Sequence, residues 1–313
     1  MTPRVESAQQ WAQQGERGSR FALRLMAFIA LRCGRPVARL VLHPITLYFM
    51  LFAPQPRRHS VRYLKRALGR AVTWRDAYRH VHAFASTVLD RVYLARGQIE
   101  AFDFRLSGQA LMDETVASGR GAVLLGAHMG SFEALHALGA SRPGQRVAMA
   151  MYPDNARMIH QVLSAVAPHA HLDIIAIGRP ASTLQIRDWL DSGGLVGMLG
   201  DRHLPPATGR ANDSVVLPFL GHDARFSDGP LRVAMLLRRR VIFMVGLYRG
   251  GRRYDVRFET LADFSQASAN AAERERAVHE ALRRYVERLE SLCREAPSNW
   301  FNFFDFWGED VQH

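Results

Sequence analysis

Short apolar runs alternate with helical patterns from Gln98 onward, and this alternation constrains the fold more than any other feature of the sequence. Strands and helices that alternate in this way build a sheet with helices packed on it. The pair Gly250-Gly251 separates the last two apolar runs and predicts a hairpin, so we expect that edge of the sheet to be antiparallel. The sequence therefore predicts an α/β fold with a mixed, largely parallel sheet flanked by helices.

The apolar patterns also place the individual elements. Strands are predicted at residues 102–106, 122–125, 146–151, 172–177, 195–199, 215–219, 241–248 and 254–258. Helices are predicted at residues 110–117, 132–138, 156–166, 183–191, 230–238 and 273–294. We expect these elements to form one α/β domain over residues 98–313.

Residues 1–97 differ from the rest, because their patterns are helical throughout. A strongly apolar stretch runs from Phe21 to Pro54 and is interrupted by Gly34-Arg35-Pro36. Neither half offers the roughly 20 apolar residues that a simple spanning helix needs. An amphipathic run at 57–68 follows, and then a capping box of Thr73 and Asp76 opens a helix that we expect to end near Leu94.

Two interpretations of the apolar stretch stand side by side. It is either a pair of buried helices in a soluble protein or a segment that associates with a membrane. Arginines around it favour the second interpretation, because guanidinium groups bind anionic phospholipid headgroups. They are Arg17, Arg20, Arg24, Arg32, Arg35 and Arg39. We therefore expect residues 1–97 to contact membrane phospholipid at the cell inner membrane, with the α/β domain on the cytoplasmic face.

Composition excludes several classes of site. Basic residues exceed acidic ones by 12, and Lys65 is the only lysine, so the charge is almost entirely arginine and Schiff-base chemistry is disfavoured. The basic residues are dispersed over no known nucleic-acid-binding fold, so we expect no nucleic acid partner. Two cysteines cannot build a disulfide framework. His169 and His171 lack a further cluster of ligands, so we expect no metal.

The most informative segment is GAVLLGAHMGSFEAL at residues 121–135. An apolar strand leads into a glycine-containing turn that carries His128, and Glu133 follows in the first turn of the next helix. Ligands bind at the carboxyl ends of strands in open α/β sheets, which places His128 in a functional position. We expect the Glu133 carboxylate to reach back to the imidazole, fix its tautomer and raise its basicity. The alternative is a buried strand-end histidine beside a solvated glutamate.

The segment GAHMGSFEAL resembles the His-x4-Asp/Glu motif of the bacterial lipid A late acyltransferases, the lauroyl and myristoyl transferases of the lysophospholipid acyltransferase superfamily. The resemblance covers about residues 20–307. Further landmarks of that family follow in the same order: Leu199–Arg202, Pro218–Gly221, Gly229-Pro230 and Ala296–Phe301.

This resemblance implies an O-acyltransferase that needs no cofactor. Its donor is an acyl-carrier-protein or acyl-CoA thioester, and its acceptor is a hydroxyl of a lipid or glycolipid. His128 is then the general base and Glu133 orients it, while backbone N–H groups near Gly130 and Ser131, or the guanidinium of Arg157 or Arg202, stabilise the oxyanion. The family pattern places Asp201 as an organiser of the substrate site. The alternative for the two arginines is a structural ion pair.

The acceptor stays open at this point. The tail at residues 303–307 is aromatic where lipid A enzymes have a basic tail. The chain thereby resembles a branch of acyltransferases that includes members encoded beside aryl-polyene or xanthomonadin-type pigment genes. Lipid A, lysophospholipid and pigment-lipid acylation are all compatible with the residues. A hydrolase is disfavoured because no G-x-S-x-G elbow is present. A non-catalytic membrane-binding relative is the remaining alternative.

Overall fold

The computed structural model describes residues 20–140, 145–153, 173–178, 180–202, 214–266, 268 and 270–309. The chain divides into two compact units, neither of which is continuous in sequence. The sheet unit consists of residues 91–201 and 228–289, and the helical unit consists of residues 1–90, 202–227 and 290–313. The functional division expected at residue 97 stays a prediction.

The sheet unit contains short strands and helices in alternation. Its strands are β1 (Asp103–Ser107), β2 (Ala122–Gly126), β3 (Val147–Met151), β4 (Asp173–Ala176), β5 (Leu195–Leu199), β8 (Arg240–Tyr248) and β9 (Arg253–Asp263). Its helices are η1 (Ile99–Ala101), α5 (Gln109–Ala117), α6 (Phe132–Ala140), α8 (Pro180–Asp191), α9 (Gly229–Leu236) and most of α10 (Ala271–Glu295). The alternation predicted from the sequence is therefore confirmed.

Within the described residues, these strands form one sheet in the order β1-β9-β8-β2-β5-β3-β4. Neighbours from β8 to β4 are parallel, and the Gly250-Gly251 hairpin makes β9 antiparallel to β8. The expectation that this hairpin forms the edge is wrong, because β1 pairs in parallel with the outer side of β9. The edge strand is thus β1, which runs in the direction of β9 and opposite to the parallel strands.

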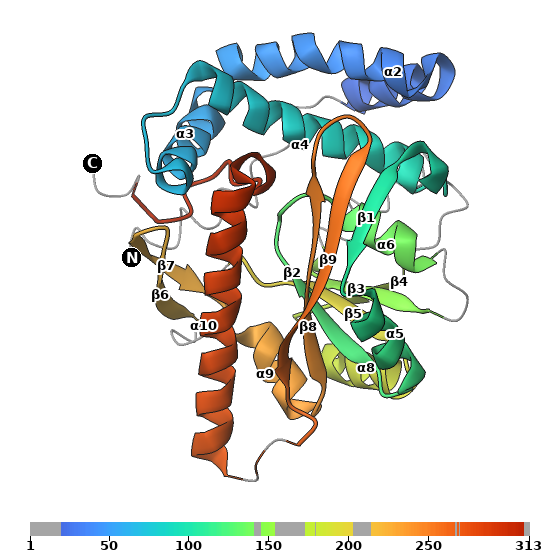
Figure 1. Ribbon diagram of the computed structural model, residues 1–313, viewed down its shortest axis with the longest axis vertical. Coiled ribbons are helices and arrows are strands. Elements are labelled where there is room, and N and C mark those ends of the chain that lie inside the picture. The colour runs from blue at the N-terminus through green and yellow to red at the C-terminus, as the bar shows by residue number, and fades with distance from the viewer. Residues whose placement is uncertain are drawn as a thin grey trace. The chain divides into compact units, whose positions relative to one another are not determined.

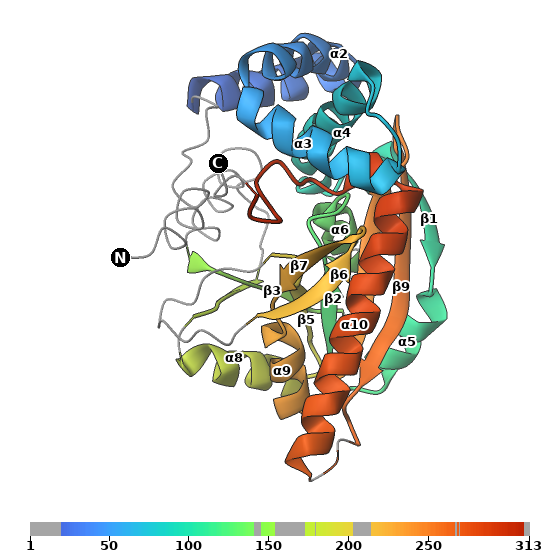
Figure 2. The same cartoon turned by 90° about the vertical axis from the view of Figure 1, so that its left-hand side faces the viewer.

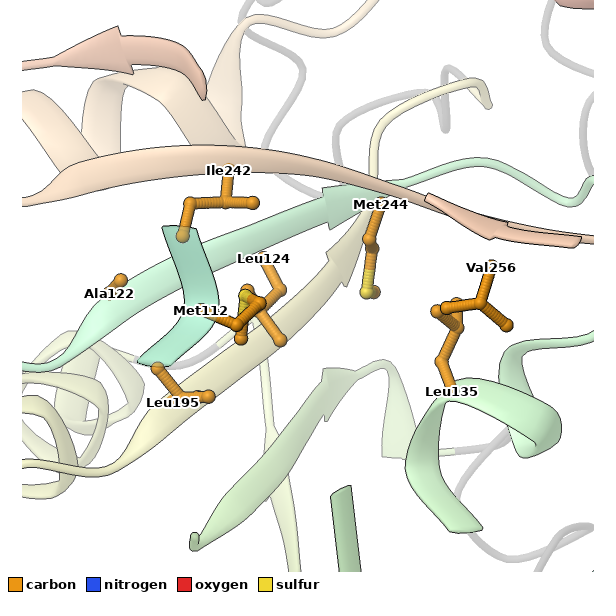
Figure 3. Close-up of a cluster of buried hydrophobic side chains, with 8 residues drawn as sticks. All are labelled: Met112, Ala122, Leu124, Leu135, Leu195, Ile242, Met244 and Val256. Atoms are coloured by element: carbon orange, nitrogen blue, oxygen red, sulfur yellow. The ribbon is translucent and has the colours of Figure 1, made fainter. Parts of the chain in front are cut away.

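Helices pack on both faces of this sheet. In Figure 1, α10 runs along β8 and β9 on one side and α5 lies on the other, and in Figure 2 β9 again lies between them. Leu124 and Met244 belong to the face that packs against Met112 of α5 and Leu135 of α6 (Figure 3). On the other face, Tyr285 of α10 lies 5.8 Å from Phe243, measured between ring centroids. Because successive side chains of a strand point to opposite faces, β8 contributes apolar side chains to the contacts with both layers of helices.

The helical unit contains α2 (Arg20–Phe52), α3 (Pro54–Leu68), most of α4 (Trp74–Leu94), η2 (Pro297–Asn299) and a separate hairpin of β6 (Val215–Phe219) and β7 (His222–Phe226). Its core is aromatic. The ring centroid of the buried Trp300 lies 4.9 Å from that of Tyr63 and 5.3 Å from that of Phe219. The tail joins this core, since Phe306 and Trp307 both pack edge-to-face against the ring of Trp300. The aromatic tail therefore stabilises the unit to which it belongs.

Local signals in the sequence explain several boundaries. The predicted capping box is confirmed: the Asp76 N–H donates to Thr73 Oγ1 at 3.2 Å, and the Thr73 N–H donates to Asp76 Oδ2 at 2.9 Å. The guanidinium of Arg70, which donates to Asp76 Oδ2 at 2.8 Å, and then the hydrogen bonds with Thr73 hold the pKa of the Asp76 carboxyl well below its usual value. Strand β7 was missed, because only Ala224 and Phe226 are buried along it and its apolar pattern is too short. The predicted helix at 156–166 lies outside the described residues.

Helix α2 has two contrasting faces. Ala38, Leu42, Thr46 and Met50 are buried at intervals of four residues. Large apolar side chains on the rest of the helix are exposed, namely Val37, Leu40, Leu47, Tyr48, Phe49, Leu51 and Phe52. In the part of the chain that the structure describes, no single helix has both the length and the apolar composition to cross a membrane. The segments Arg32–Phe52 and Pro54–Leu68, bent by 95°, meet those conditions only as a pair.

Candidate active site

The turn between β2 and α6 positions His128 at the carboxyl end of the sheet. Gly130 makes this turn possible, because its φ of +66° lies in the left-handed region and an added Cβ would lie 2.0 Å from the carbonyl oxygen of Gly246. The Ser131 N–H donates to that same oxygen at 2.8 Å, which anchors the turn to β8. Ser131 Oγ then accepts from the N–H of Ala134 at 3.1 Å and caps α6. Gly130 and Ser131, expected in the substrate site, thus shape the turn.

A second strand end meets this turn. Gly126 of β2 pairs with Leu199 of β5, and the Gly200 N–H donates to the Gly126 carbonyl at 3.0 Å. The hydroxyl of Tyr285 donates to the same carbonyl at 2.8 Å. His128 and Asp201 each follow this register by two residues, so the parallel pairing of β2 and β5 brings them together.

The imidazole of His128 is hydrogen-bonded to the carboxylate of Asp201. The Nδ1 atom lies 2.8 Å from Asp201 Oδ1, and the same oxygen accepts the backbone N–H of His128 at 3.0 Å. The Asp201 side chain is 1% exposed and that of His128 is 31% exposed. Because an ionised carboxylate only accepts hydrogen bonds, Nδ1 carries the proton in the neutral ring. Nε2 is then the basic nitrogen, on a side chain that solvent reaches.

Glu133 does not make the contact that its spacing predicts. Its Oε1 lies 2.9 Å from Nε of Arg91, and its Oε2 accepts from Ser131 Oγ at 3.3 Å. The reason is geometric: Ser131 caps α6, so Glu133 is the second residue of the helix, and there its carboxylate lies beside Arg91. The structure therefore corrects the geometry of the expected His128–Glu133 pair, because Asp201 holds the imidazole. No sequence signal marks Arg91, which lies 42 positions before Glu133.

A mainly apolar cavity of about 80 Å³ lies between the sheet and helices α5 and α6. Phe132, the first residue of α6, lines it, together with Leu124 and Met244 from the sheet. Gly139 and Gln145 close another part of its wall. The cavity therefore offers an apolar surface that begins two residues from Gly130.

The remaining predicted site residues fall elsewhere. Arg157 lies outside the described residues, as do His169 and His171. Arg202 belongs to the helical unit, where its guanidinium carbon lies 5.0 Å from the centroid of the Phe304 ring. Among the residues that the structure describes, no group of three His, Cys, Asp or Glu side chains is placed to hold a metal ion.

Comparison with known protein families gives a match over most of the chain. The family described as bacterial lipid A biosynthesis acyltransferase matches residues 87–308 of the chain. That range includes the β2–α6 turn, Arg91, Asp201 and the aromatic tail. A search of curated proteins finds no match to the chain.

Proposed function

The chain belongs to the bacterial lipid A biosynthesis acyltransferase family, and on this premise we propose that it transfers an acyl group from a thioester to a hydroxyl of a lipid acceptor. The observation that carries the proposal is the contact between His128 and the buried Asp201 at the ends of two neighbouring strands. A neutral imidazole with its proton on Nδ1 presents Nε2 as a general base.

The proposed reaction is a direct transfer without an acyl-enzyme. The acceptor oxygen attacks the thioester carbonyl carbon while Nε2 of His128 takes the hydroxyl proton. The resulting oxyanion then collapses, the C–S bond breaks, and the imidazolium returns the proton to the departing thiolate. The products are an ester and a free thiol, so atoms and charge balance. General-base catalysis of this kind contributes roughly 10²–10⁴-fold to the rate.

The oxyanion needs hydrogen-bond donors that are in place before the reaction. We propose that the first helical residues of α6, Phe132 and Glu133, supply such donors, because the first N–H groups of a helix have no partner within the helix and lie at the positive end of its dipole. Arg157 and Arg202 stay candidates for a second donor or for an acceptor phosphate. We propose that the cavity lined by Phe132 receives part of the acyl chain, since its wall is mainly apolar.

The donor is an acyl-carrier-protein or coenzyme A thioester in this proposal. Both donors are acidic, and a chain with a formal net charge of +12 attracts them. For the acceptor, lipid A precursors, lysophospholipids and pigment lipids are the three classes to compare.

We also propose that the protein works at the cell inner membrane, with the site on the cytoplasmic face. Support comes from the exposed apolar side chains of α2, since a gathering of large exposed apolar side chains marks a membrane or protein contact. Arg32 of α2 and Arg58 of α3 are also exposed, and guanidinium groups suit anionic headgroups.

A transfer assay with labelled acyl donors tests the proposal directly. We expect wild-type protein in lipid vesicles to acylate at least one of the three acceptor classes. His128→Gln should lower kcat at least 100-fold, because the base is lost, with an unchanged unfolding transition. The matched control is His222→Gln, which removes an exposed histidine on β7 and should leave kcat unaltered. Turnover by His128→Gln at the wild-type rate would contradict the proposal, and absence of transfer by the wild type with every donor would favour the non-catalytic alternative.

A further inference from the structure

A groove of about 460 Å³ lies between α9 and the first turns of α10, within the sheet unit. Figures 1 and 2 both show these two helices side by side. Strand β8 begins at Arg240, soon after the groove, and there it pairs in parallel with Ala122 at the start of β2. His128 follows the opposite end of β2, so the groove is separate from the proposed active site.

The groove contains an apolar contact point. Leu236, the last residue of α9, lines it and is 71% exposed, more than any other large apolar side chain among the described residues. The buried Met235 and Val278 line the same groove. A single exposed leucine is ordinary on a protein surface. Here it adjoins a hollow with further apolar side chains, so it can pack against a partner that enters the groove.

The charges of the groove leave it positive. Three arginines line it, Arg232, Arg238 and Arg274, against one carboxylate, Glu275. Arg232 donates to both oxygens of Glu275, at 2.6 and 2.8 Å, so these two charges neutralise each other. Arg238 is exposed, and in the described part of the chain no carboxylate pairs with it. The groove therefore suits an acidic partner, since guanidinium groups bind carboxylates across an interface.

The backbone at Arg238 supports a role for its side chain. Its φ of +52° lies in the left-handed region, just after the C-terminal end of α9, where glycine is the usual residue. The next two arginines, Arg239 and Arg240, form ion pairs with carboxylates of the same unit. Backbone in a sparsely populated conformation is typical of positions whose side chain has a function. Arg238 thus keeps a cation at the groove where glycine would be more stable.

Helix α10 connects the groove to the proposed active site. The hydroxyl of Tyr285 donates to the carbonyl of Gly126 at 2.8 Å, two residues before His128. Arg274 and Tyr285 are separated by roughly 16 Å along this helix, at about 1.5 Å per residue. The phosphopantetheine arm of an acyl-carrier protein spans a distance of this order. A carrier bound in the groove therefore lies within one arm of the base.

We propose that this groove docks an acyl-carrier protein, with Arg238 and Arg274 facing its acidic surface and Leu236 packing against an apolar side chain. The inference rests on the proposed function, because it names the protein that delivers the thioester. The exposed leucine favours a carrier protein over coenzyme A, whose phosphates need only the arginines. Docking at this end of the parallel strands leaves the end with His128 free for the lipid acceptor.

The first test measures binding without any reaction. Fluorescently labelled apo-acyl-carrier protein is titrated with the full-length chain in detergent micelles, and anisotropy gives Kd. Arg238→Gly should weaken binding at least tenfold at low salt, and its unfolding midpoint should not fall, because glycine relieves the left-handed backbone. Leu236→Ser should weaken binding at moderate salt as well, since an apolar contact is not screened.

The matched control for charge is Arg283→Gln. Arg283 is an exposed arginine on α10 that does not line the groove and pairs with Glu280 and Glu287. Its loss removes the same charge from the same helix, so Kd should change less than twofold. Equal weakening by Arg283→Gln and Arg238→Gly would assign the attraction to the overall charge of the chain and overturn the proposal.

The second test compares donors in the transfer assay. Arg238→Gly and Leu236→Ser should raise KM at least tenfold for acyl-acyl-carrier protein with kcat little altered, and should leave KM for acyl-pantetheine unchanged. An equal rise in KM for both donors, or carrier binding by both variants at the wild-type Kd, would overturn the docking site. If Arg238→Gly fails to fold, Leu236→Ser decides. If no acyl transfer is found at all, the proposed function fails, while the binding titration still tests the groove.

Discussion

His80 shows how a single buried polar residue is accommodated in the helical unit. Its side chain is fully buried, Nδ1 lies 2.7 Å from Ser60 Oγ, and Nε2 lies 2.8 Å from the carbonyl oxygen of Trp300. A carbonyl only accepts, so Nε2 carries the proton and Ser60 donates to Nδ1. Burial lowers the pKa of the His80 ring to about 4, against its ordinary value of 6.5. The ring is thus held neutral by a complete set of hydrogen bonds.

This pKa predicts a loss of stability in mild acid. Between pH 6.5 and about 4 the unfolded chain binds a proton at His80 that the folded chain does not, so the free energy of unfolding should fall as pH decreases through this range. The measurement is urea unfolding from pH 7.5 to 4.5 for wild type and His80→Gln. The variant should be less stable at pH 7.5, with a shallower dependence on pH. Comparison with the variant removes the contribution of His82, whose pKa burial also lowers to about 4. Parallel pH profiles would contradict the prediction.

At the scale of elements, the start of α6 links the base to the apolar cavity. Gly130 and Ser131 place the helix start, and the next residue, Phe132, already lines the cavity. Gly139 lies near the other end of α6 and also lines the cavity. An added Cβ at Gly139 would be in ordinary contact, 3.4 Å from Val147 Cγ2. One helix therefore holds the turn of His128 and the wall of the proposed acyl site.

Enlarging Gly139 should change the preference for chain length. Gly139→Leu adds a side chain toward the cavity, so we expect kcat/KM to fall most for the longest acyl donors and least for short ones. Gly139→Ala is the control, because its methyl group fits without displacing the wall. The measurement is kcat/KM over a series of donors that differ only in chain length. A uniform decrease for all lengths would mean that the chain binds elsewhere.

At the scale of the whole molecule, exposed apolar side chains gather on one helix of the helical unit. Leu40 is 68% exposed and Phe52 is 63% exposed on α2, while Ala38 and Met50 are buried on the other face. Such a surface is costly in water unless a membrane or a partner covers it. We have proposed the membrane, because arginines accompany the apolar side chains.

Removing this surface should release the protein from lipid. Leu40→Glu combined with Phe52→Glu should weaken binding to vesicles of anionic phospholipid by at least tenfold, because two charges replace exposed apolar groups. The fold should persist, since neither side chain is buried. Leu236→Glu is the control: this leucine on α9 is 71% exposed, so its replacement tests whether any exposed leucine has the same effect. Co-sedimentation with vesicles measures the binding, and equal binding by the double variant and the control would contradict the membrane assignment of α2.

Local patterns in the sequence determined most of the elements. Periodicity placed all eight predicted strands on strands of the structure, and Thr73 with Asp76 and the pair Gly250-Gly251 marked a helix start and a hairpin. These features depend on residues only a few positions apart, whose burial and backbone preferences are visible in the sequence itself. The motif around His128 likewise pointed to the family that matches the chain.

Tertiary structure alone decided what those elements contact. The insertion of β9 between β1 and β8, and the meeting of His128 with Asp201 across 73 positions, follow from strand pairing and register. The spacing of His128 and Glu133 predicted a contact between these two residues. Spacing shows which residues are near each other in the chain, but it does not show toward which partner the Glu133 carboxylate points once α6 has formed. Hydrogen bonds between strand ends depend on register over long separations, and periodicity carries no information on that register.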